Sequence, residues 1–495
     1  MVTRDGESGA LDESDGEVCF NGICGATGGY PFEPVTLAEL AAVARGEPVE
    51  IGPLRRAARW LRSKVGQWRE PRDPYSASRL EEAGWGVIFG CGADPRIRQA
   101  LRPLLDWRQS AAAAVDERRY RELWGPSGYR PGESMRDFLL RHKTELGAAD
   151  PGQLPYYLLL IGGPEEIPFS FQYDLDLRHA VGRLDLETSE DYAAYAASVI
   201  AAEKAWSAPP LALDIPPPRR AVFFCPRNKD PMSGRMRKEL VGNLLDRLSV
   251  KPVPGWELQP VLEEQASKEM LQQLLGGQDR PAFLFAACHG LVFGAADERQ
   301  REKQGALLCQ ARTGALPLDA AVAASDIADD ACPHGLIAMH FACYGAGTPA
   351  RDEFSRDHRA IAPRPFTARL PQRLLGHPRG AALAVVGHVE RAWSYSFTGY
   401  GKAPQLNTFE DLIRRLLRGL PVGFALELLN LRYAQLAAEL LDLREHEELE
   451  PTNRVKDSVL AGVYCATRDA RNYVVLGDPA ARLLPDVAAK PEQAA

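Results

Sequence analysis

Three side chains capable of acid–base or nucleophilic chemistry close apolar runs of strand length in this sequence: His289, Cys343 and His388. A thiol attacks as the thiolate, and because its ordinary pKa is about 8.5, it needs a neighbouring imidazole to react at neutral pH. The three residues therefore predict cysteine-based nucleophilic catalysis, provided that the fold brings the ends of their strands together.

Glycines stand beside two of these side chains. Gly290 follows His289, while Gly345 and Gly347 closely follow Cys343. Because a glycine leaves the backbone free to turn, we expect the amides of Gly290 and Cys343 to stabilise a developing oxyanion. The alternative from the residues alone is that Cys343 is a small buried hydrophobe and His289 a hydrogen-bonded strand-end histidine.

The chain alternates strand-like and helix-like patterns from about residue 81 onward. Two apolar runs, 85–90 and 156–163, precede a proline-rich stretch at 208–220, and five more follow it. Those five are 221–225, 256–262, 282–290, 335–345 and 380–390. This alternation predicts an α/β fold with an open, mainly parallel sheet covered by helices. Ligands of such sheets bind beyond the carboxyl ends of the strands, where the three reactive side chains stand.

The proline-rich stretch also divides the chain. We expect an amino-terminal segment over residues 1–80, a first, smaller α/β subdomain over 81–215 and a catalytic subdomain over 216–495. The amino-terminal segment is rich in glycine and carries a basic helical pattern at 53–68. We interpret it as a pro-region or a docking element.

Three local predictions concern elements around the site. Alternating residues predict a strand over 173–178, with Asp174 and Asp176 on the same face. An Ala-rich helix is expected to begin with Ser189 as its N-cap. The alanines of 319–329 predict a further helix.

Composition places the chain among ordinary globular proteins. Of its 495 residues, 45% are hydrophobic and 25% charged, and the net charge is −7 with the basic residues dispersed. Neither nucleic acid nor an anionic membrane is therefore expected as a partner. The 9 cysteines are too few for a disulfide scaffold, and the acidic start lacks an apolar leader, so we expect a reduced, cytoplasmic protein.

No metal or cofactor is expected. The pair Cys19 and Cys24 has no second pair nearby, which favours two loop thiols over a metal site. The segment 90–95 lacks the third glycine of a dinucleotide-binding turn, and the sequence has neither a P-loop nor a G-x-S-x-G elbow. These observations argue against nucleotide-dependent and serine-hydrolase chemistry.

Five sequence boxes, in order along the chain, resemble one family of enzymes. The strand ends CHG (288–290) and HFACYGAG (340–347) look like the His-Gly and Ala-Cys boxes of caspase-fold cysteine peptidases, with the gingipain family and CHAT domains as the nearest likenesses. Two boxes within 158–184 resemble the first subdomain of that family. The segment 472–484 resembles its terminal strand with a Leu-Gly-Asp-Pro turn.

The resemblance implies a caspase-like fold with a Cys-His dyad. It implies that His289 is the general base and Cys343 the nucleophile, with the amides of Gly290 and Cys343 as the oxyanion hole. His388 is the rival base. Peptide hydrolysis would proceed through a thioester acyl-enzyme, with protonated His289 donating to the leaving amine. We therefore expect a cysteine endopeptidase that cleaves a protein partner, as a regulated bacterial effector.

A second group of residues concerns recognition of the P1 side chain of the substrate. Basic-specific gingipains carry an acid that corresponds to Asp174, with Asp176 beside it, so the resemblance implies a preference for Arg or Lys. The alternative is a solvated strand face on which Arg178 neutralises both acids. Trp393 looks like the tryptophan that walls the S1 pocket. Arg391 departs from the family and either pairs with Asp174 or selects an acidic P1.

Two charged segments, 294–305 and 348–366, follow the two dyad residues. The ordinary interpretation of such charged segments is that they are solvated loops. Enzymes of the family it resembles are commonly zymogens, held inactive until processed or bound, so a lid or a cleavage site is the functional interpretation. With a basic P1, autoprocessing would fall between Arg351 and Arg359. An activating or inhibitory protein partner is expected for the same reason.

Two other functions stay open at this stage. One is a non-catalytic protein-binding module on a caspase-like scaffold, with the amino-terminal segment as its surface. The other is a thiol-dependent acyltransferase, which shares the acyl-enzyme step. The presence of both His289 and Cys343 with flanking glycines favours the peptidase, because a binding module has no need for that pair.

Overall fold

The structure is a computed structural model. It describes residues 75–144, 149–207, 219–311, 316–398, 405–449 and 452–483, with short pieces at 17–18, 22–25, 28, 35–36, 41 and 44–45. The basic pattern at 53–68, Cys19 and nearly all of the proline-rich stretch at 208–220 lie outside the described residues.

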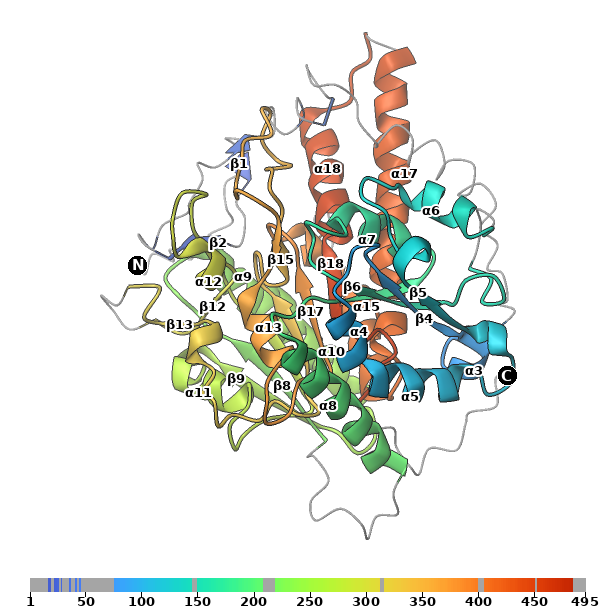
Figure 1. The fold of residues 1–495 in the computed structure, drawn as a ribbon. Helices are drawn as coiled ribbons and strands as arrows, with labels where there is room; N and C mark the ends of the chain where they lie inside the picture. Colours follow the sequence, from blue (N-terminus) through green and yellow to red (C-terminus); the bar gives the residue numbers. More distant parts are fainter. Residues whose placement is uncertain are drawn as a thin grey trace, which may run out of the picture.

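A ten-stranded sheet forms the centre of the molecule, in the order β5-β4-β6-β7-β18-β17-β14-β10-β8-β9 (Figure 1). Its strands are β4 Trp85–Phe89, β5 Tyr120–Leu123, β6 Tyr157–Ile161, β7 Ala180–Leu184, β8 Arg220–Cys225, β9 Glu257–Leu262, β10 Phe283–Ala287, β14 Ile337–Phe341, β17 Ala384–His388 and β18 Tyr473–Gly477. Strands β6, β10, β14 and β17 are buried along their full length, as strands covered on both faces should be. The predicted α/β fold with an open, mainly parallel sheet covered by helices is confirmed.

One antiparallel pair, β17 with β18, divides this sheet into two halves that run in opposite directions. Within each half, all neighbouring strands are parallel. The carboxyl ends of β10, β14 and β17 therefore share an edge of the sheet with the amino end of β7. Strands from both sides of the proline-rich stretch thus lie in a single sheet.

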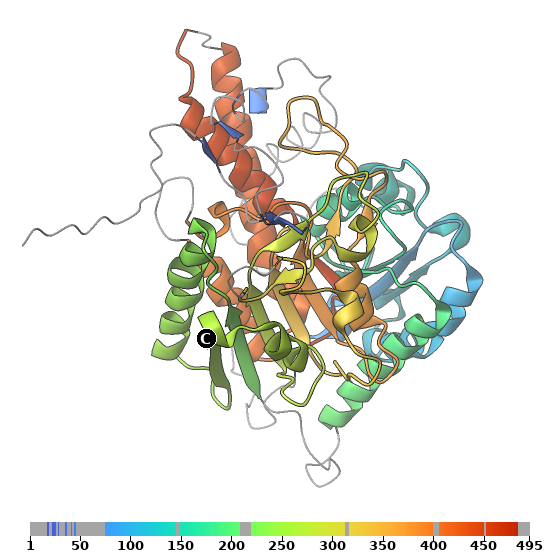
Figure 2. The ribbon, with the colours of Figure 1, turned by 90° about the vertical axis from the view of Figure 1, so that its left-hand side faces the viewer.

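Helices lie on both sides of the sheet (Figures 1 and 2). They are α3 Leu80–Ala83, α4 Pro95–Ala100, α5 Arg102–Ala112, α6 Met135–Arg141, α7 Phe169–Asp176, α8 Ser189–Ser207, α9 Pro231–Arg235, the π-helical η5 Met236–Gly242, α10 Asn243–Val250, α11 Lys268–Leu274, α12 Gln300–Lys303, α13 Arg369–Leu375, α14 Tyr395–Thr398, α15 Asn407–Leu417, α16 Val422–Ala425, α17 Glu427–Leu449 and α18 Asp457–Arg471. The hairpin of α17 and α18 extends well beyond the sheet in Figure 1.

A smaller four-stranded sheet stands beside the candidate site, in the order β13-β12-β11-β2. Its strands are β2 Gly22–Cys24, β11 Gly290–Val292, β12 Leu307–Leu308 and β13 Ala321–Val322. Strand β2 belongs to the amino-terminal segment and pairs in parallel with β11, so that Gly22 lies opposite Gly290. The same segment reaches the α17–α18 hairpin, where Arg45 pairs with Glu447 and Asp457.

The predicted strand over 173–178 is wrong, because α7 occupies this region. Apolar residues stand at every second position from 169 to 177, but the same residues also repeat at the four-residue spacing of a helix. Phe169 stacks on Tyr173 one turn later, with ring centroids 6.3 Å apart. Asp176 then ends the helix and accepts the Val181 N–H at 3.0 Å.

Two further local predictions are wrong. Residues 319–329 form β13 and a short 3₁₀ turn, η7 Ala324–Asp326, because pairing with β12 outweighs the helix propensity of alanine. The N-cap of α8 is Thr188 rather than Ser189. The Asp191 N–H donates to the Thr188 hydroxyl at 3.2 Å, and the Thr188 N–H donates back to the Asp191 carboxylate at 3.1 Å.

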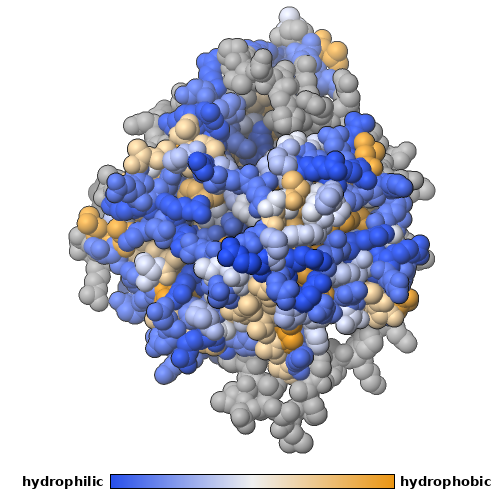
Figure 3. All heavy atoms as spheres, in the orientation of Figure 1, coloured by the Kyte–Doolittle hydropathy of each residue, from blue (hydrophilic) through white to orange (hydrophobic). Residues whose placement is uncertain are grey.

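Apolar surface does not gather on the face that Figure 3 shows, which is mainly hydrophilic with small, scattered hydrophobic patches. Among the residues that the structure describes, the exposed large hydrophobic side chains are Val115, Leu140, Val250, Leu316 and Leu449. Among the described residues, no helix is both long and apolar enough to cross a lipid bilayer.

Candidate active site

The sheet register brings His289 and Cys343 to the same place. Strands β10 and β14 are parallel neighbours, with Ala287 opposite Phe341, and continuing this register by two residues sets His289 opposite Cys343. A hydrogen bond beyond the paired residues, from the Cys288 N–H to the Phe341 carbonyl at 3.2 Å, shows that the pairing continues. Both dyad candidates are buried: His289 is 1% exposed and Cys343 is 0% exposed.

Gly290 permits this close approach. A Cβ atom at position 290 would lie only 1.9 Å from the carbonyl oxygen of Cys343 and 3.1 Å from its nitrogen. Gly290 is not among the glycines with positive φ. Glycine is therefore required here by the contact of two backbones, rather than by the freedom of the N–H to turn that we expected.

Cys343 stands at a backbone turn that ordinary residues rarely adopt. Tyr344 follows it with φ of 58°, and Glu390, on the neighbouring segment, has φ of 70°. The Tyr344 N–H donates to the Glu390 carbonyl at 2.6 Å, which joins the two strained positions. Such outliers persist where the surrounding structure holds them, and they cluster at functional sites.

The sulfur of Cys343 is enclosed. Its Sγ accepts the Ala392 N–H at 3.2 Å. Burial raises the pKa of the Cys343 thiol, and this backbone hydrogen bond opposes the shift only in part. In this state of the molecule the thiol form is favoured, so the nucleophile must be opened to water or substrate before it can ionise readily.

His289 has a carboxylate partner that the sequence analysis missed. Its Nε2 lies 2.8 Å from the Oδ1 of Asp230, whereas its Nδ1 is buried and has no hydrogen-bond partner among the described residues. With Asp230 accepting the Nε2–H, the lone pair of the ring resides on Nδ1. The arrangement resembles a base with an orienting acid behind it.

Asp230 is fixed independently of the histidine. It is the N-cap of α9, where its Oδ1 accepts the Ser233 N–H at 2.9 Å. Burial raises the pKa of Asp230, but the hydrogen bond and charge of His289 together with the hydrogen bonds from Ser233 outweigh this effect, and the pKa falls to about 2. A signal existed in the sequence: Asp230 precedes Pro231, which is typical of a helix start, shortly after the strand at 221–225.

The rival base His388 lies at the end of β17 but is turned toward another element. Its Nε2 is 3.0 Å from the Asp469 carbonyl of α18 and 3.4 Å from the Asp469 carboxylate. Its ring meets the Tyr473 ring edge-on at 4.9 Å. These contacts give His388 a packing environment between β17, α18 and β18.

The two other candidates on the 390–393 segment both contact the loop that follows Cys343. Arg391 binds Asp352 with both terminal nitrogens, at 2.6 and 2.9 Å, and contacts Glu390 at 2.9 Å. Trp393 packs against Phe354 with ring centroids 4.9 Å apart. Thus two of the predicted S1 residues touch the segment 348–366 rather than an open pocket.

The two acidic S1 candidates lie at the end of α7, near the amino end of β7. Burial raises the pKa of Asp174 to about 6, and the charge that opposes this shift is Arg471. Burial also raises the pKa of Asp176, whose carboxylate accepts the Val181 N–H. We had considered a pair between Arg391 and Asp174, but the structure pairs Arg391 with Asp352 and Glu390. The charge that acts on Asp174 is that of Arg471 in α18.

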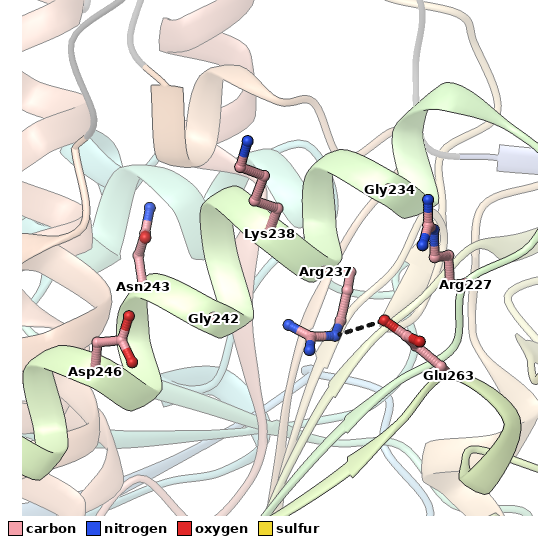
Figure 4. Close-up of a pocket in the computed structure, with 8 residues that line it drawn as sticks. All are labelled: Arg227, Gly234, Arg237, Lys238, Gly242, Asn243, Asp246 and Glu263. Carbon is pink, nitrogen blue, oxygen red and sulfur yellow. Dashed lines mark ion pairs between the residues drawn. The ribbon is translucent and has the colours of Figure 1, made fainter. Parts of the chain in front are cut away.

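A cleft of about 440 Å³ lies along α9, η5 and α10 (Figure 4). Its lining residues are Arg227, Gly234, Arg237, Lys238, Gly242, Asn243, Asp246 and Glu263. Arg237 reaches across it to Glu263 at 3.3 Å. Neither dyad residue lines this cleft. Within the described residues there is also no group of three or more His, Cys, Asp or Glu side chains arranged to hold a metal ion.

No protein-family model matches the sequence, and neither does any curated protein. Solved structures similar to this fold include the Arg-specific cysteine proteinase gingipain R, at 12% identity and a TM-score of 0.42 over 81% of this chain and 78% of that one. The complex of the Porphyromonas gingivalis RgpB pro- and mature domains is similar at 12% identity, with a TM-score of 0.44 over 81% and 79%. The separase–securin complex of Saccharomyces cerevisiae is similar at 10% identity, with a TM-score of 0.30 over 66% of this chain and 16% of that one.

Proposed function

We propose that this protein is a cysteine endopeptidase in which Cys343 is the nucleophile and His289 the general base. The observation that carries the proposal is the convergence of three strand ends. The register of β10 and β14 sets His289 opposite Cys343, and Asp230 after β8 holds the imidazole by its Nε2. A core histidine and a core cysteine have no need of this acid behind the ring.

The reaction follows from the free nitrogen. His289 Nδ1 takes the thiol proton, and the sulfur attacks the carbonyl carbon of the scissile peptide bond. The oxyanion that forms would be held by the backbone amides of Gly290 and Cys343. The C–N bond then breaks as His289 returns the proton to the leaving amine, which leaves a thioester on Cys343. Water, deprotonated by His289, hydrolyses the thioester and regenerates the thiol.

His289 is favoured over His388 as the base. Asp230 fixes the His289 ring and leaves Nδ1 unused, whereas His388 Nε2 faces Asp469 in the packing between β17 and α18. Removal of the His388 ring would leave the proposed proton transfer from the Cys343 thiol to His289 Nδ1 intact. We expect it to cost stability because the ring is fully buried.

The substrate is a protein partner, and two forms of P1 recognition compete. In the first, Asp174 and Asp176 favour Arg or Lys at P1, and autoprocessing then falls between Arg351 and Arg359. In the second, Arg391 takes an acidic P1. The enclosed sulfur of Cys343 supports a regulated, zymogen-like enzyme, which an activating protein would open.

Cleavage of a peptide library with mixed P1 residues by the wild-type protein and by Cys343→Ala tests the proposal. We expect products from the wild type and none from Cys343→Ala. Equal product formation by both proteins would contradict it. A protein that cleaves nothing, and whose Cys343 stays unlabelled by thiol reagents when its loop is opened, would be a binding module on this fold.

A further inference from the structure

A positive charge lies directly beside the proposed nucleophile. The segment 390–393 passes along Cys343, because Ala392 N–H donates to its sulfur at 3.2 Å and the Glu390 carbonyl accepts the Tyr344 N–H. Arg391 lies between these two contacts in the chain. Its side chain is only 3% exposed, so its charge needs a partner inside the protein.

One partner is the carboxylate of Asp352, held in the geometry that guanidinium groups recognise best, and another is Glu390, whose Oε1 lies 2.9 Å from Nη1 of Arg391. Asp352 accepts from Nη1 and Nη2 of Arg391 through its two oxygens, and it is 1% exposed. Burial raises the pKa of Asp352, but the hydrogen bonds and charge of Arg391, together with the Phe354 N–H and the charge of Arg359 at 3.1 Å, outweigh this effect and the pKa is lowered. Burial raises the pKa of the neighbouring Glu390, so Asp352 is the more readily ionised of the two acids that contact Arg391.

Asp352 belongs to a loop and not to the sheet that frames the site. The strands β15 Gly347–Thr348 and β16 Phe366–Thr367 pair antiparallel and close its base. Above them the loop folds on itself: the Asp352 N–H donates to the Arg359 carbonyl at 2.9 Å, and Ile361 N–H to the Ala350 carbonyl at 3.0 Å. The loop is also tied to two helices, because Glu353 pairs with Arg468 and Arg471 of α18 and the Gln300 amide of α12 donates to the Ile361 carbonyl at 2.7 Å. Displacement of the loop must therefore break these contacts as well as the pair with Arg391.

The same loop also covers Trp393, the residue that we expected to wall the S1 pocket. Phe354, two residues after Asp352, is 2% exposed and packs against Trp393. The guanidinium of Arg391 lies 5.5 Å from the centre of the Phe354 ring. One loop thus places a carboxylate on Arg391 and an aromatic ring on Trp393, both beside a cysteine that no solvent reaches.

We propose that Arg391 selects the substrate by binding an acidic P1 side chain, and that Asp352 occupies the place of that side chain in this structure. The inference rests on the proposed peptidase function and adds its substrate class. A substrate then enters by displacing the loop 349–365, with its own carboxylate replacing that of Asp352 on Arg391.

The charges explain why an acidic residue is preferred. An Asp or Glu at P1 restores the carboxylate pairing of Arg391, whereas a neutral P1 does not replace the two hydrogen bonds that Asp352 accepted, and this loss is unfavourable for a buried cation. An Arg or Lys at P1 places two cations together. We therefore expect cleavage rates to decrease in the order acidic, neutral, basic.

Four fluorogenic peptides that differ only at P1, with Asp, Asn, Leu or Arg, test this order on the full-length protein. We expect kcat/KM for the Asp peptide to exceed that for the Asn peptide by about 100-fold. Asp352→Asn weakens the internal competitor, so it should raise kcat/KM for the Asp peptide by about tenfold.

A double variant guards against the possibility that a single substitution, by leaving one charge of the pair alone, prevents folding. Asp352→Asn with Arg391→Gln removes both charges of the pair at nearly constant volume. Of the other charged partners, Arg359 is 46% exposed, and Glu390 has a pKa that burial raises, so that it can take up a proton when Arg391 is removed. We expect it to cleave the Asp and Asn peptides at rates within about threefold of one another. Asp478→Asn is the matched control, because it breaks another buried Arg–Asp pair, with Arg108, and should leave the Asp-to-Asn ratio unchanged.

The possible failures are distinguishable. If the double variant keeps the Asp preference, or if the wild type prefers the Arg peptide and Cys343→Ala cleaves nothing, the peptidase stands and the role of Arg391 is overturned. If no variant cleaves any peptide and iodoacetamide does not label Cys343 in Asp352→Asn, the proposed function fails and this inference fails with it.

Discussion

The hydrogen bond between Asp230 and His289 decides which ring nitrogen acts as the base in the proposed reaction. Asp230 accepts from Nε2 and is itself held as the N-cap of α9. An uncharged amide in its place would no longer stabilise the imidazolium that forms when the thiol proton is transferred.

Asp230→Asn therefore tests this contact. We expect kcat/KM for peptide cleavage to fall roughly 100-fold, while the side chain keeps its helix-capping role. Peptide cleavage by purified variant and wild type measures the effect. Unchanged kcat/KM would show that Asp230 does not support the base.

The same variant has a pH signature in stability. The folded-state pKa of Asp230, about 2, lies below its ordinary value of about 4. This depressed pKa contributes stability that is present above pH 4 and lost as the pH falls toward 2, with a full value of about 2 kcal/mol. The difference in unfolding free energy between wild type and Asp230→Asn should shrink over that window, and a difference that grows instead would contradict the assignment.

Gly290→Ala tests the contact between the two backbones of the site. The added Cβ would meet the Cys343 carbonyl at 1.9 Å, so the strand ends must separate, which costs about 1–3 kcal/mol and displaces the proposed oxyanion donors. We expect a lower midpoint of thermal unfolding and a loss of cleavage. Gly294→Ala is the control, since nothing lies within 4 Å of its Cβ position. Equal effects of both variants would argue against a specific contact.

Some residues of the site could be predicted from the sequence and others could not. His289 and Cys343 could be predicted because each closes a strand-like run, and parallel strands collect such ends at one edge. Asp230 stands 59 residues from His289, and Asp352 stands 39 residues from Arg391. Pairings at these separations depend on how loops fold back, which residue types and spacing do not encode.

Among the elements, strand β2 connects the amino-terminal segment to the site. It pairs with β11, the strand that starts directly after His289, and Ile23 packs with Leu291 and Phe293 in a small apolar cluster. Within the described part of the chain, β2 is an edge strand that pairs with β11, so we expect its attachment to depend on the buried side chain of Ile23.

Ile23→Asp should therefore detach β2 without unfolding the central sheet. Placing a carboxylate at a position with 6% exposure is costly, and the strand avoids this cost by leaving β11. Limited proteolysis should cut near residues 22–25 faster than in wild type, with the main thermal transition unchanged. Ile23→Val keeps the contact and should behave as wild type. Unaltered proteolysis of Ile23→Asp would show that β2 is held in another way.

The elements differ in how well their patterns predict them. Continuous apolar runs identified β4, β6, β10, β14 and β17, because strands covered on both faces are apolar throughout. The short α7 was mistaken for a strand, since its apolar residues satisfy two periods at once. Strand β5 was missed, because its four residues, YREL, carry two charges and no apolar run.

In the whole molecule, the two halves of the sheet are joined through the terminal strand β18. At its end, Asp478 accepts from Trp85 of β4 at 2.9 Å and from Arg108 of α5 at 2.6 Å. Arg108 also binds Glu203 of α8 at 2.6 Å. The antiparallel position of β18 was not predictable, because a buried apolar strand has the same pattern in either direction.

Asp478→Asn should destabilise the whole molecule. It removes one of two carboxylates from a guanidinium that is 3% exposed, at a cost of about 3 kcal/mol. The midpoint of thermal unfolding, followed by circular dichroism, should fall. An exposed pair serves as the control: Asp94→Asn breaks its contact with Arg96 and should leave the midpoint unchanged within error. Equal midpoints for both variants would show that the buried network adds no stability.

The central claim is that Cys343 and His289, and not His388, form the catalytic pair. It is tested most directly by measuring kcat/KM for one cleaved peptide in Cys343→Ala, His289→Ala and His388→Ala, each with its folding checked by circular dichroism. The account predicts no detectable cleavage by the first two variants and cleavage within about tenfold of wild type by the third. Cleavage that survives in His289→Ala and disappears in a folded His388→Ala would contradict it.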